Sequence, residues 1–251
     1  MGMTTSTVVI TGASSGIGAA TAELLGGQGV QLVLVARRTD ALAAVAARSG
    51  RAHAVTADMT RRGDVRRVVG EAIERFGGID VWINNVGQGI TRMPTELTDD
   101  DIDQVMRVNV KSALYGMQEV LPHFIERGAG QVINVSSLLG RMPMATMRSA
   151  YCGAKHFLNA LTATFRAEVQ EGHPGIQFSL VSPGVVQTDF GLNALHGGPD
   201  SRQLPYSQTA EEVALVIAEV IATRAPDVYT RAGSARSVAE YYARVGRDPG
   251  V

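Results

Sequence analysis

The sequence predicts an α/β fold: one doubly wound, mostly parallel seven-stranded sheet with helices on both faces. Short apolar runs alternate with longer helical patterns along the whole chain, and the turn after the first run is rich in glycine. No change of composition and no internal repeat divides the 251 residues. Because strands that alternate with helices form right-handed βαβ units, the helices fall on both faces of one sheet. We therefore expect a single domain over residues 1–251.

Seven short runs have the pattern of buried parallel strands, since they are rich in apolar and β-branched residues and are bounded by turn residues. They cover residues 7–11, 31–35, 53–56, 80–84, 131–136, 176–181 and 227–230. The first run, TVVIT, and the second, QLVLV, are strand-length and too short for a helix that spans a membrane.

Six segments between these runs have the spacing of helices packed on a core. They cover residues 16–28, 40–49, 64–76, 99–126, 150–171 and 210–223. The only long stretch without such a pattern runs from 189 to 208 and is rich in Gly, Pro and Ser. Loops of this length in a domain often serve as lids or binding loops, so we expect this stretch to be the substrate loop.

The composition is that of an ordinary globular protein, with 45% hydrophobic and 19% charged residues. The formal net charge is −1 without blocks of like charge, so we expect neither nucleic acid nor a membrane surface as a partner. The single cysteine, Cys152, excludes an internal disulfide, and no secretory signal precedes the first strand, which favours the cytoplasm. The five histidines lack the spacing of metal ligands, so we expect no metal site.

The turn after the first strand is the strongest candidate for a ligand site, because ligands of open parallel sheets bind beyond the carboxyl ends of the strands. It reads TGASSGIG over 11–18 and opens a helix. Glycines let the backbone approach a pyrophosphate, and a helix N-terminus offers free N–H groups. A purely structural turn is the alternative, but this position favours nucleotide binding. The expected contacts are Gly12, Ser14, Ser15, Gly16, Ile17 and Gly18.

Two arginines, Arg37 and Arg38, follow the second strand. A carboxylate at this point would bind a ribose 2′-hydroxyl, whereas an arginine suits a 2′-phosphate. A solvated pair of charges is the competing interpretation. Because no acidic residue occupies the strand end, we favour NADP, with NAD as the alternative.

Polar or glycine-rich residues also follow strands three to six, as expected if one ligand lies along the sheet edge. Asp58, followed by Met59, could meet an adenine or cap the next helix. The segment NNVG at 84–87 could border the cofactor or tie strand ends together. Ser136 and Ser137 follow strand five, and PGVVQT follows strand six. Further expected cofactor contacts are Asp58, Met59, Asn85, Gly87, Pro183, Gly184, Val186 and Thr188.

Tyr151 and Lys155 lie four residues apart in a predicted helix, so that the phenol and the ammonium share a face. A phenol ionises near ~10, and a fixed positive charge beside it lowers that pKa. The pair is therefore a plausible acid–base device, although the spacing alone often arises by chance.

With these motifs in one order, the chain resembles a classical short-chain dehydrogenase/reductase over essentially its whole length. The resemblance rests on 11–18, 84–87 with Val86 where the family usually has Ala, Asn109, Ser137, Tyr151 with Lys155, and 183–188. One departure is that Ser137 lies one residue farther from Tyr151 than the family spacing. We choose Ser137 because Ser137-Leu138-Leu139-Gly140 matches the family's S-x-x-G, and we keep Ser136 as the alternative.

The resemblance implies a Rossmann-type fold and roles for each matched residue. Tyr151 would exchange a proton with the substrate oxygen, and Lys155 would lower the pKa of the phenol and bind the nicotinamide ribose. Ser137 would hold the substrate oxygen, Asn109 would keep a water in a proton relay, and Thr188 would contact the carboxamide. The helices at 99–126 and 150–171 resemble those that pair subunits in this family, which implies a homotetramer or homodimer.

The substrate class is less constrained by the sequence. Met93, Met142, Met144 and Met147 could form an adaptable apolar wall, which would suit an apolar ketone or secondary alcohol. Ordinary loop packing explains these methionines equally well. Arg92, Arg141, Arg148 and Arg202 could bind an acidic group, but solvated charge is the interpretation we favour. A cofactor-binding sensor with the same fold is the alternative function. Sugar epimerase or dehydratase chemistry is a third option, but such enzymes usually have a larger C-terminal substrate domain, and the part of this sequence after Thr188 leaves little room for one.

Overall fold

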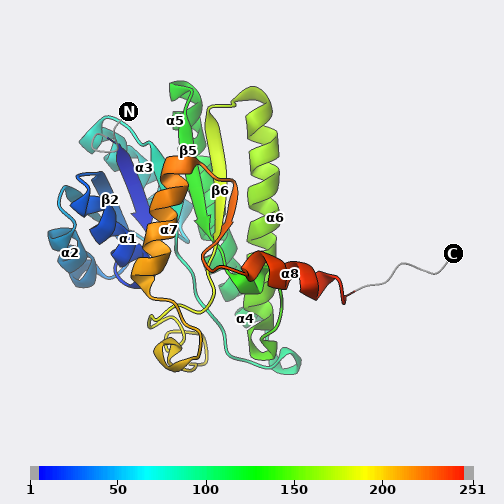
Figure 1. The fold of residues 1–251 in the computed structure, drawn as a ribbon. Coiled ribbons are helices and arrows are strands. Elements are labelled where there is room, and N and C mark those ends of the chain that lie inside the picture. Colours follow the sequence, from blue (N-terminus) through cyan, green and yellow to red (C-terminus); the bar gives the residue numbers. More distant parts are fainter. Residues whose placement is uncertain (1–5, 246–251) are drawn as a thin grey trace.

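The computed structural model describes residues 6–245 as a central sheet between two layers of helices (Figure 1). The sheet has seven strands in the order β3-β2-β1-β4-β5-β6-β7, and every neighbouring pair is parallel. The predicted doubly wound sheet is confirmed. The single domain predicted over 1–251 includes residues 1–5 and 246–251, which lie outside the described part of the chain.

The observed strands agree with the predicted ones to within one residue at each end. They are β1 (Thr7–Thr11), β2 (Gln31–Ala36), β3 (Ala52–Thr56), β4 (Val81–Asn84), β5 (Gly130–Val135), β6 (Ile176–Ser182) and β7 (Asp227–Tyr229). β1 is buried at all five positions, as expected for a strand covered on both faces.

The helices also follow the predicted pattern, with one addition. They are α1 (Gly16–Gly27), α2 (Thr39–Arg48), α3 (Arg62–Phe76), α4 (Asp99–Met106), α5 (Ser112–Arg127), α6 (Ser149–Gly172), α7 (Ala210–Thr223) and α8 (Ser234–Tyr242). α8 was not predicted, because its nine residues, SARSVAEYY, form a short helix in which only Ser234 is buried. Most of α8 is exposed, and Figure 1 shows it extending away from the sheet.

The stretch predicted as one helix over 99–126 contains a wide turn. α4 and α5 are joined without a break by a π-helical turn, η3 (Arg107–Lys111). Such turns insert one extra residue into a helix and occur frequently at functional sites. Thr98 and Asp101 start α4 with a reciprocal capping box.

Two apolar cores hold the layers together. On one face, β-strand residues pack under α1, α2 and α7 around Leu25, Leu34 and Ile217. On the other face they pack under α3, α5 and α6 around Trp82, Phe124 and Phe178. The prediction that Trp82 belongs to the core is confirmed, because its side chain is fully buried. These cores fix the sheet rigidly between the helices.

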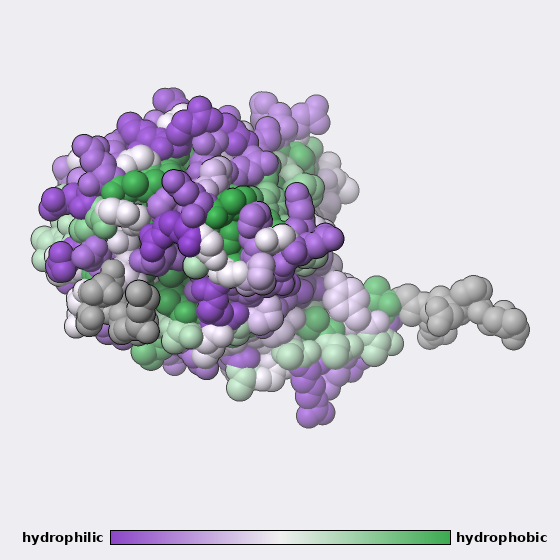
Figure 2. Space-filling model, turned by 90° about the horizontal axis from the view of Figure 1, so that it is seen from above, coloured by the Kyte–Doolittle hydropathy of each residue, from purple (hydrophilic) through white to green (hydrophobic). Residues whose placement is uncertain are grey.

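The carboxyl ends of the strands, at the lower end of Figure 1, carry the loop 189–208. This stretch forms no helix or strand except the short 3-10 turn η6 (Ser201–Gln203), as predicted for a loop. Figure 2 shows the opposite end of the molecule, where hydrophilic side chains cover most of the surface with apolar residues between them. Across residues 6–245 the helices are too short or too polar to cross a membrane.

Candidate active site

The glycine turn after β1 has the geometry of a cradle for a phosphate group. A Cβ on Gly18 would lie 2.4 Å from the carbonyl oxygen of Gly12, so α1 can approach the turn only with glycine here. Gly16 has a φ of +56°, which also favours glycine. The first residues of α1 thus leave their N–H groups free beside open backbone, which fits the pyrophosphate of a dinucleotide.

Asn85 closes this turn from β4. Its backbone N–H donates to Thr11 Oγ1 at 3.0 Å, and its Nδ2 donates to the carbonyl oxygens of Thr11 and Gly12 at 3.1 and 3.3 Å. Of the two roles considered for this segment, the Asn85 side chain therefore serves to tie the strand ends together.

Arg38 lies across the glycine turn. Its Nη2 donates to Ser14 Oγ at 3.2 Å and to Ser15 Oγ at 2.8 Å, and its side chain is otherwise exposed. Arg37 is exposed too, and its charge helps to lower the pKa of Asp58. Both arginines thus lie at the edge of the expected dinucleotide site, with Arg38 nearer to the glycines.

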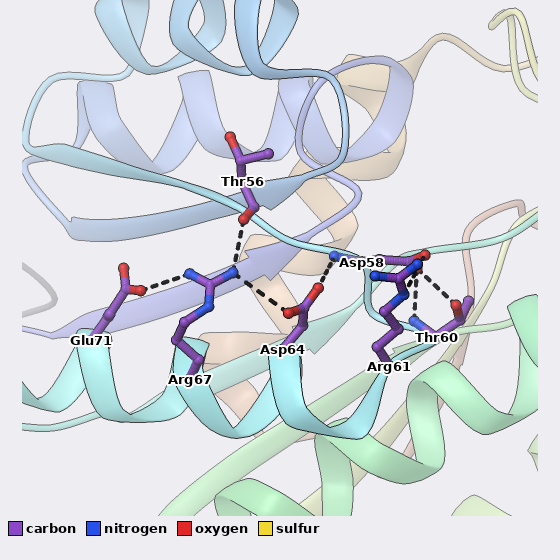
Figure 3. Close-up of polar contacts among 7 residues, drawn as sticks. All are labelled: Thr56, Asp58, Thr60, Arg61, Asp64, Arg67 and Glu71. Carbon is purple, nitrogen blue, oxygen red and sulfur yellow. Dashed lines mark hydrogen bonds and ion pairs between the residues drawn. The ribbon is translucent and has the colours of Figure 1, made fainter.

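Asp58 is held at the start of α3 (Figure 3). Its Oδ1 accepts from the N–H and hydroxyl of Thr60 at 3.0 and 2.8 Å, while its own N–H donates to Asp64. Burial alone would raise the pKa of Asp58, but the Thr60 hydrogen bonds and nearby arginines hold it below its usual value. The carboxylate therefore caps the turn into α3, and the side chain of Met59 is buried in the core.

Three of the expected catalytic residues come together below β5. Tyr151 and Lys155 lie on α6 and are only 6% and 2% exposed. Lys155 Nζ lies 5.8 Å from the centre of the Tyr151 ring and donates to the Val135 carbonyl at 2.9 Å. The Ser137 side chain lies near enough to the Tyr151 phenol to lower its pKa, and its Oγ accepts from the N–H of Leu139 at 3.1 Å.

The choice between the two serines follows from their directions. Ser136 Oγ donates to Asn159 inside the protein, away from the phenol. Asn159 in turn donates to the Gly140 carbonyl at 2.7 Å, and a Cβ on Gly140 would lie 2.9 Å from Cβ of Lys155. Ser137 is thus the serine that faces Tyr151, and the S-x-x-G turn packs closely against α6.

Burial dominates the electrostatics of the pair. It raises the pKa of Tyr151 to about 12, with the Ser137 hydrogen bond acting in the opposite direction. Burial also lowers the pKa of Lys155 to about 8. We expected Lys155 to hold the pKa of the phenol down. In this structure the ammonium donates to the Val135 carbonyl, and desolvation of the phenol is the largest effect on its pKa, so the role expected for Lys155 stays a prediction.

Asn109 lies in the π turn and is fully buried. Its Nδ2 donates to the carbonyls of Gln88 and Val105, both at 2.9 Å, and its Oδ1 accepts from the Gln88 N–H at 3.1 Å. Asn109 Oδ1 and Lys155 Nζ lie 3.2 and 3.7 Å from one point, where a Cβ on Gly87 would be. The amide therefore fixes the segment after β4 and stands beside the lysine.

The segment after β6 returns to the glycine turn. The Thr188 methyl lies 3.0 Å from the position of a Cβ on Gly16. The Pro183 carbonyl accepts from the N–H of Leu138 at 2.7 Å, which joins this segment to the serine turn. A groove of about 280 Å³ runs here between α1 and the loop, lined by Gly16, Ala19, Ala20, Glu23, Gln187, Thr188, Asp189, Arg202, Ala210 and Glu211.

The remaining residues expected to contact the cofactor are packed against other parts of the protein. Ile17 and Val186 pack against the first core, so their side chains have a structural part. A Cβ on Gly184 would lie 3.2 Å from Cδ of Arg231. These positions offer a ligand mainly their backbone.

Phe190 is a site residue that sequence reasoning missed. Its ring packs on Tyr151 with 5.5 Å between the ring centres and an angle of 60° between the planes. It belongs to the loop 189–208, so the only sequence signal was a lone aromatic residue just beyond Thr188. Of the methionines expected to form a wall, Met142 is buried, while Met93, Met144 and Met147 are exposed.

Comparison with known proteins gives the same family throughout. A family model described as short chain dehydrogenase matches residues 6–196. An uncharacterized oxidoreductase of Staphylococcus saprophyticus is 36% identical over 185 residues, which are 73% of this chain and 75% of that protein. An uncharacterized oxidoreductase of Staphylococcus aureus strain N315 is 32% identical over 213 residues, with 84% and 90% covered.

Solved structures agree in fold over nearly the whole chain. A short chain dehydrogenase/reductase from Burkholderia phymatum in complex with NAD has a TM-score of 0.88 at 25% identity, covering 100% of this chain and 99% of that one. A short-chain dehydrogenase from Sphingobium yanoikuyae in complex with NADPH has a TM-score of 0.81 at 29% identity, with 98% of both chains covered. The chain is an oxidoreductase that belongs to the classical short-chain dehydrogenase/reductase family.

Proposed function

We propose that this protein is an NADP-dependent oxidoreductase that interconverts a ketone or aldehyde and an alcohol by hydride transfer. The observation that carries the proposal is that Ser137, Tyr151 and Lys155 meet beside a glycine turn shaped for a dinucleotide. One group can exchange a proton, one can hold an oxygen, and one carries a positive charge. This is the set of groups that a carbonyl reduction needs from the protein.

The preference for NADP rests on Arg38. Similar structures hold NAD in one case and NADPH in another, so the family allows both cofactors. In this chain an exposed guanidinium lies over Ser14 and Ser15 at the end of β2, where no acidic residue competes. A guanidinium suits a 2′-phosphate and gives no advantage to a ribose 2′-hydroxyl.

The proton is proposed to come from Tyr151. The cofactor, when bound, would supply the hydride. With a pKa of about 12, the phenol is protonated at neutral pH and is therefore a proton donor toward a carbonyl oxygen. Ser137 would donate a hydrogen bond to the same oxygen as negative charge develops on it. The Lys155 ammonium, 5.8 Å from the ring centre, would then stabilise the phenolate that remains.

Asn109 is proposed to support this proton transfer from behind. Its amide is held by Gln88 and Val105 next to Lys155 Nζ, so it fixes the place where a relay to solvent could begin. Thr188, beside Gly16, is proposed to contact the carboxamide of the nicotinamide.

The wall around Tyr151 supports a substrate with an apolar body. Phe190 covers the phenol, and Ile90 and Leu139 belong to the same apolar cluster. A ketone or secondary alcohol with a hydrocarbon chain would fit this surface.

A cofactor-binding sensor with the same fold is the competing function. A sensor has no need of acid–base residues, whereas Asn109, Ser137, Tyr151 and Lys155 are all present and lie together. We therefore prefer the enzyme. We also propose a homotetramer or homodimer in the cytoplasm, without a metal, acting on a small molecule and not on nucleic acid or a membrane.

Turnover of a ketone panel by the wild type and by Tyr151→Phe tests the enzyme proposal. NADPH oxidation should fall about 10²- to 10⁴-fold in the variant, because the proton donor is lost. Thermal shift with NADP should stay close to that of the wild type, since the ring and its packing remain. Equal turnover by the variant, or NADP binding without turnover of any carbonyl by the wild type, would refute the assignment.

A further inference from the structure

Arg148, at the start of α6, has no partner for its charge. Its guanidinium makes no hydrogen bond to any residue in the range 6–245, and no carboxylate in that range lies within 4.0 Å. Nη1 is fully buried and unsatisfied. Burial lowers the pKa of this guanidinium, yet an arginine stays protonated in proteins. Arg148 as a whole is half-buried, but its buried Nη1 is unfavourable without a hydrogen-bond acceptor, which an anion can supply.

The three arginines that the sequence analysis grouped with Arg148, as possible binders of an acidic group, each have a carboxylate partner. Arg92 contacts Asp101 at 3.0 Å, Arg141 contacts Asp227, and Arg202 contacts Asp200 at 2.8 Å. Each of these charges is thus compensated within the protein. Arg148 differs from them, and its place before the first residues of α6 adds the positive end of a helix to its own charge.

The guanidinium lies close to the proposed catalytic residues. Its Nη1 lies 2.5 Å from the position of a Cβ on Gly89, and the Phe190 ring lies 3.1 Å from the same point. Phe190 in turn packs on Tyr151. The guanidinium charge also acts on the Tyr151 phenol, where it lowers the pKa against the effect of burial. Arg148 therefore stands one aromatic ring away from the phenol.

A second unsatisfied group lies beside it. The Thr91 hydroxyl is buried and has no hydrogen-bond partner among residues 6–245. Thr91 Oγ1 and Arg148 Nη2 lie 2.9 and 3.0 Å from one point, where a Cβ on Gly198 would be. The Thr91 hydroxyl and the Arg148 guanidinium thus lie near each other, both beside Gly198 in the loop 189–208. Buried polar groups without partners call for an explanation, and a ligand that satisfies both supplies one.

We propose that Arg148 and Thr91 bind a carboxylate of the carbonyl substrate, so that the enzyme acts on oxo acids and the matching hydroxy acids. One guanidinium and one hydroxyl suit an anion of single charge, and arginine binds carboxylates with two parallel hydrogen bonds. The apolar wall at Phe190 would then hold the hydrocarbon part of the same molecule. This assignment rests on the proposed function, and it replaces the solvated charge that the sequence favoured for Arg148.

The test compares acids with their esters. NADPH oxidation is measured with 2-, 3-, 4- and 5-oxohexanoate and with the methyl ester of each. The four isomers place the ketone at different distances from the carboxylate, so that one of them can match the distance between Tyr151 and Arg148. For at least one isomer, kcat/KM should be about 10- to 100-fold higher for the acid, as expected for hydrogen bonds to a charged group. In Arg148→Met this ratio should fall to about one, and in Thr91→Val it should fall about threefold. The control Arg236→Met removes an exposed charge on α8 and should keep the ratio.

Equilibrium binding separates this inference from the enzyme proposal. Titration calorimetry of the NADP-loaded protein should show hexanoate binding more tightly than hexanamide, and Arg148→Met should abolish the difference. Arg148→Lys replaces the Met variant in this test if the Met variant does not fold. Because lysine keeps the charge, this variant should retain part of the difference in affinity between hexanoate and hexanamide. Turnover of esters and acids at equal rates by the wild type would overturn the carboxylate site while leaving the enzyme intact. Hexanoate binding that depends on Arg148, without turnover of any carbonyl, would support the carboxylate site and refute the enzyme. If hexyl phosphate binds more tightly than hexanoate, the carboxylate assignment is excluded.

Discussion

At the scale of single residues, burial sets the chemistry of the Tyr151–Lys155 pair. The same desolvation raises the pKa of the phenol to about 12 and lowers that of the ammonium to about 8. Both shifts favour the neutral forms, as a buried site requires. At neutral pH the phenol keeps its proton and the lysine is still mostly charged. The pair is therefore prepared for donation to a carbonyl oxygen.

The lysine makes a prediction about stability against pH. Its pKa in the folded protein is about 8, below the usual 10.5, so between these values the unfolded chain binds more protons. The free energy of unfolding should therefore rise with pH across this window, and by about 3 kcal/mol at most through this group. Lys155→Met keeps the length of the side chain and should remove that rise. Urea unfolding of both proteins at pH 7.5, 8.5 and 9.5 measures the difference, and parallel curves would contradict it.

Arg38 makes a prediction about the cofactor. Arg38→Ala should weaken binding of NADP about 10- to 100-fold, because a charged hydrogen bond to the 2′-phosphate is lost. Binding of NAD should change little. Titration of intrinsic fluorescence with each cofactor gives both constants, and Arg236→Ala is the control for loss of an exposed arginine. An equal loss for NADP and NAD would show that Arg38 supports the turn at Ser14 and Ser15 and does not select the cofactor.

The sequence could identify the reacting residues but not their environment. The Y-x-x-x-K spacing and the S-x-x-G turn follow from local chain geometry, which is why Tyr151, Lys155 and Ser137 could be predicted to lie together. Whether Arg148 finds a carboxylate depends on segments far apart in the chain, and no local pattern reveals it. The same holds for the direction of the Tyr151 shift, which depends on how completely the protein covers the phenol.

At the scale of elements, the loop 189–208 is attached at two levels. Its backbone pairs with the segment after β4, where the Leu195 N–H donates to the Gly89 carbonyl at 2.9 Å and its carbonyl accepts from Thr91 at 3.0 Å. Its side chain His196 contacts Asp101 at the start of α4 at 2.7 Å. The loop is therefore held against the Tyr151 region by contacts to two neighbouring elements.

Asp101 is the residue on which this closure depends most. It is 6% exposed, and it accepts from Arg92 and His196 as well as from its own helix cap. Hydrogen bonding from His196 is the largest of the effects that lower its pKa to about 2. Asp101→Asn should therefore loosen the loop and speed amide hydrogen exchange in 189–208 about tenfold, since a charged contact is lost.

Mass spectrometry of exchanged peptides measures this effect. The control is Asp227→Asn. Asp227 lies on β7, away from His196, and pairs with Arg141, so its loss should leave exchange in the loop unchanged. If both variants exchange alike in 189–208, the Asp101 contacts do not hold the loop.

Strands were predictable as elements, whereas irregular features of the helices were not. The apolar runs of the strands are buried on both faces, so hydrophobicity alone marks them, and the limits of β1 agree with the prediction at both ends. The π turn at Arg107–Lys111 keeps helical periodicity on either side and has no signal of its own in composition. α8 escaped prediction because it is only nine residues long and mostly exposed, although Ala235, Val238, Ala239 and Tyr242 have helical spacing.

At the scale of the whole molecule, the parallel sheet explains why the candidate site is assembled from so many segments. Each strand ends at the same edge, so that turns from β1, β2, β4, β5 and β6 meet although the residues span from Gly12 to Thr188. The serine turn, the glycine turn and the Thr188 segment are held by hydrogen bonds between neighbouring strand ends, such as that from Leu138 to Pro183. The rigid cores fix these distances, and the loop 189–208 completes the wall.

The outer face of α6 makes a prediction about assembly. Phe157 is 50% exposed there, and the exposed positions around it, Gly153, Ala160 and Thr164, carry no charge. An exposed apolar stripe of this kind on a long helix is typical of a subunit interface. We therefore expect the wild type to be a dimer or tetramer at micromolar concentration. Phe157→Glu would bury a charge without a partner and should weaken association by about a hundredfold or more.

Size-exclusion chromatography with light scattering, across a dilution series, measures this association. Leu215→Glu is the matched control, because Leu215 is also exposed, at 59%, but lies on α7 on the opposite face of the sheet. It should leave the mass of the particle unchanged. A wild type that remains monomeric at all concentrations would contradict the interface, and equal dissociation by both variants would show that α6 has no special part in it. Association stabilises the folded protein by mass action, so the unfolding temperature of the wild type should rise with protein concentration. The effect includes the candidate site, because Tyr151 and Lys155 lie on α6.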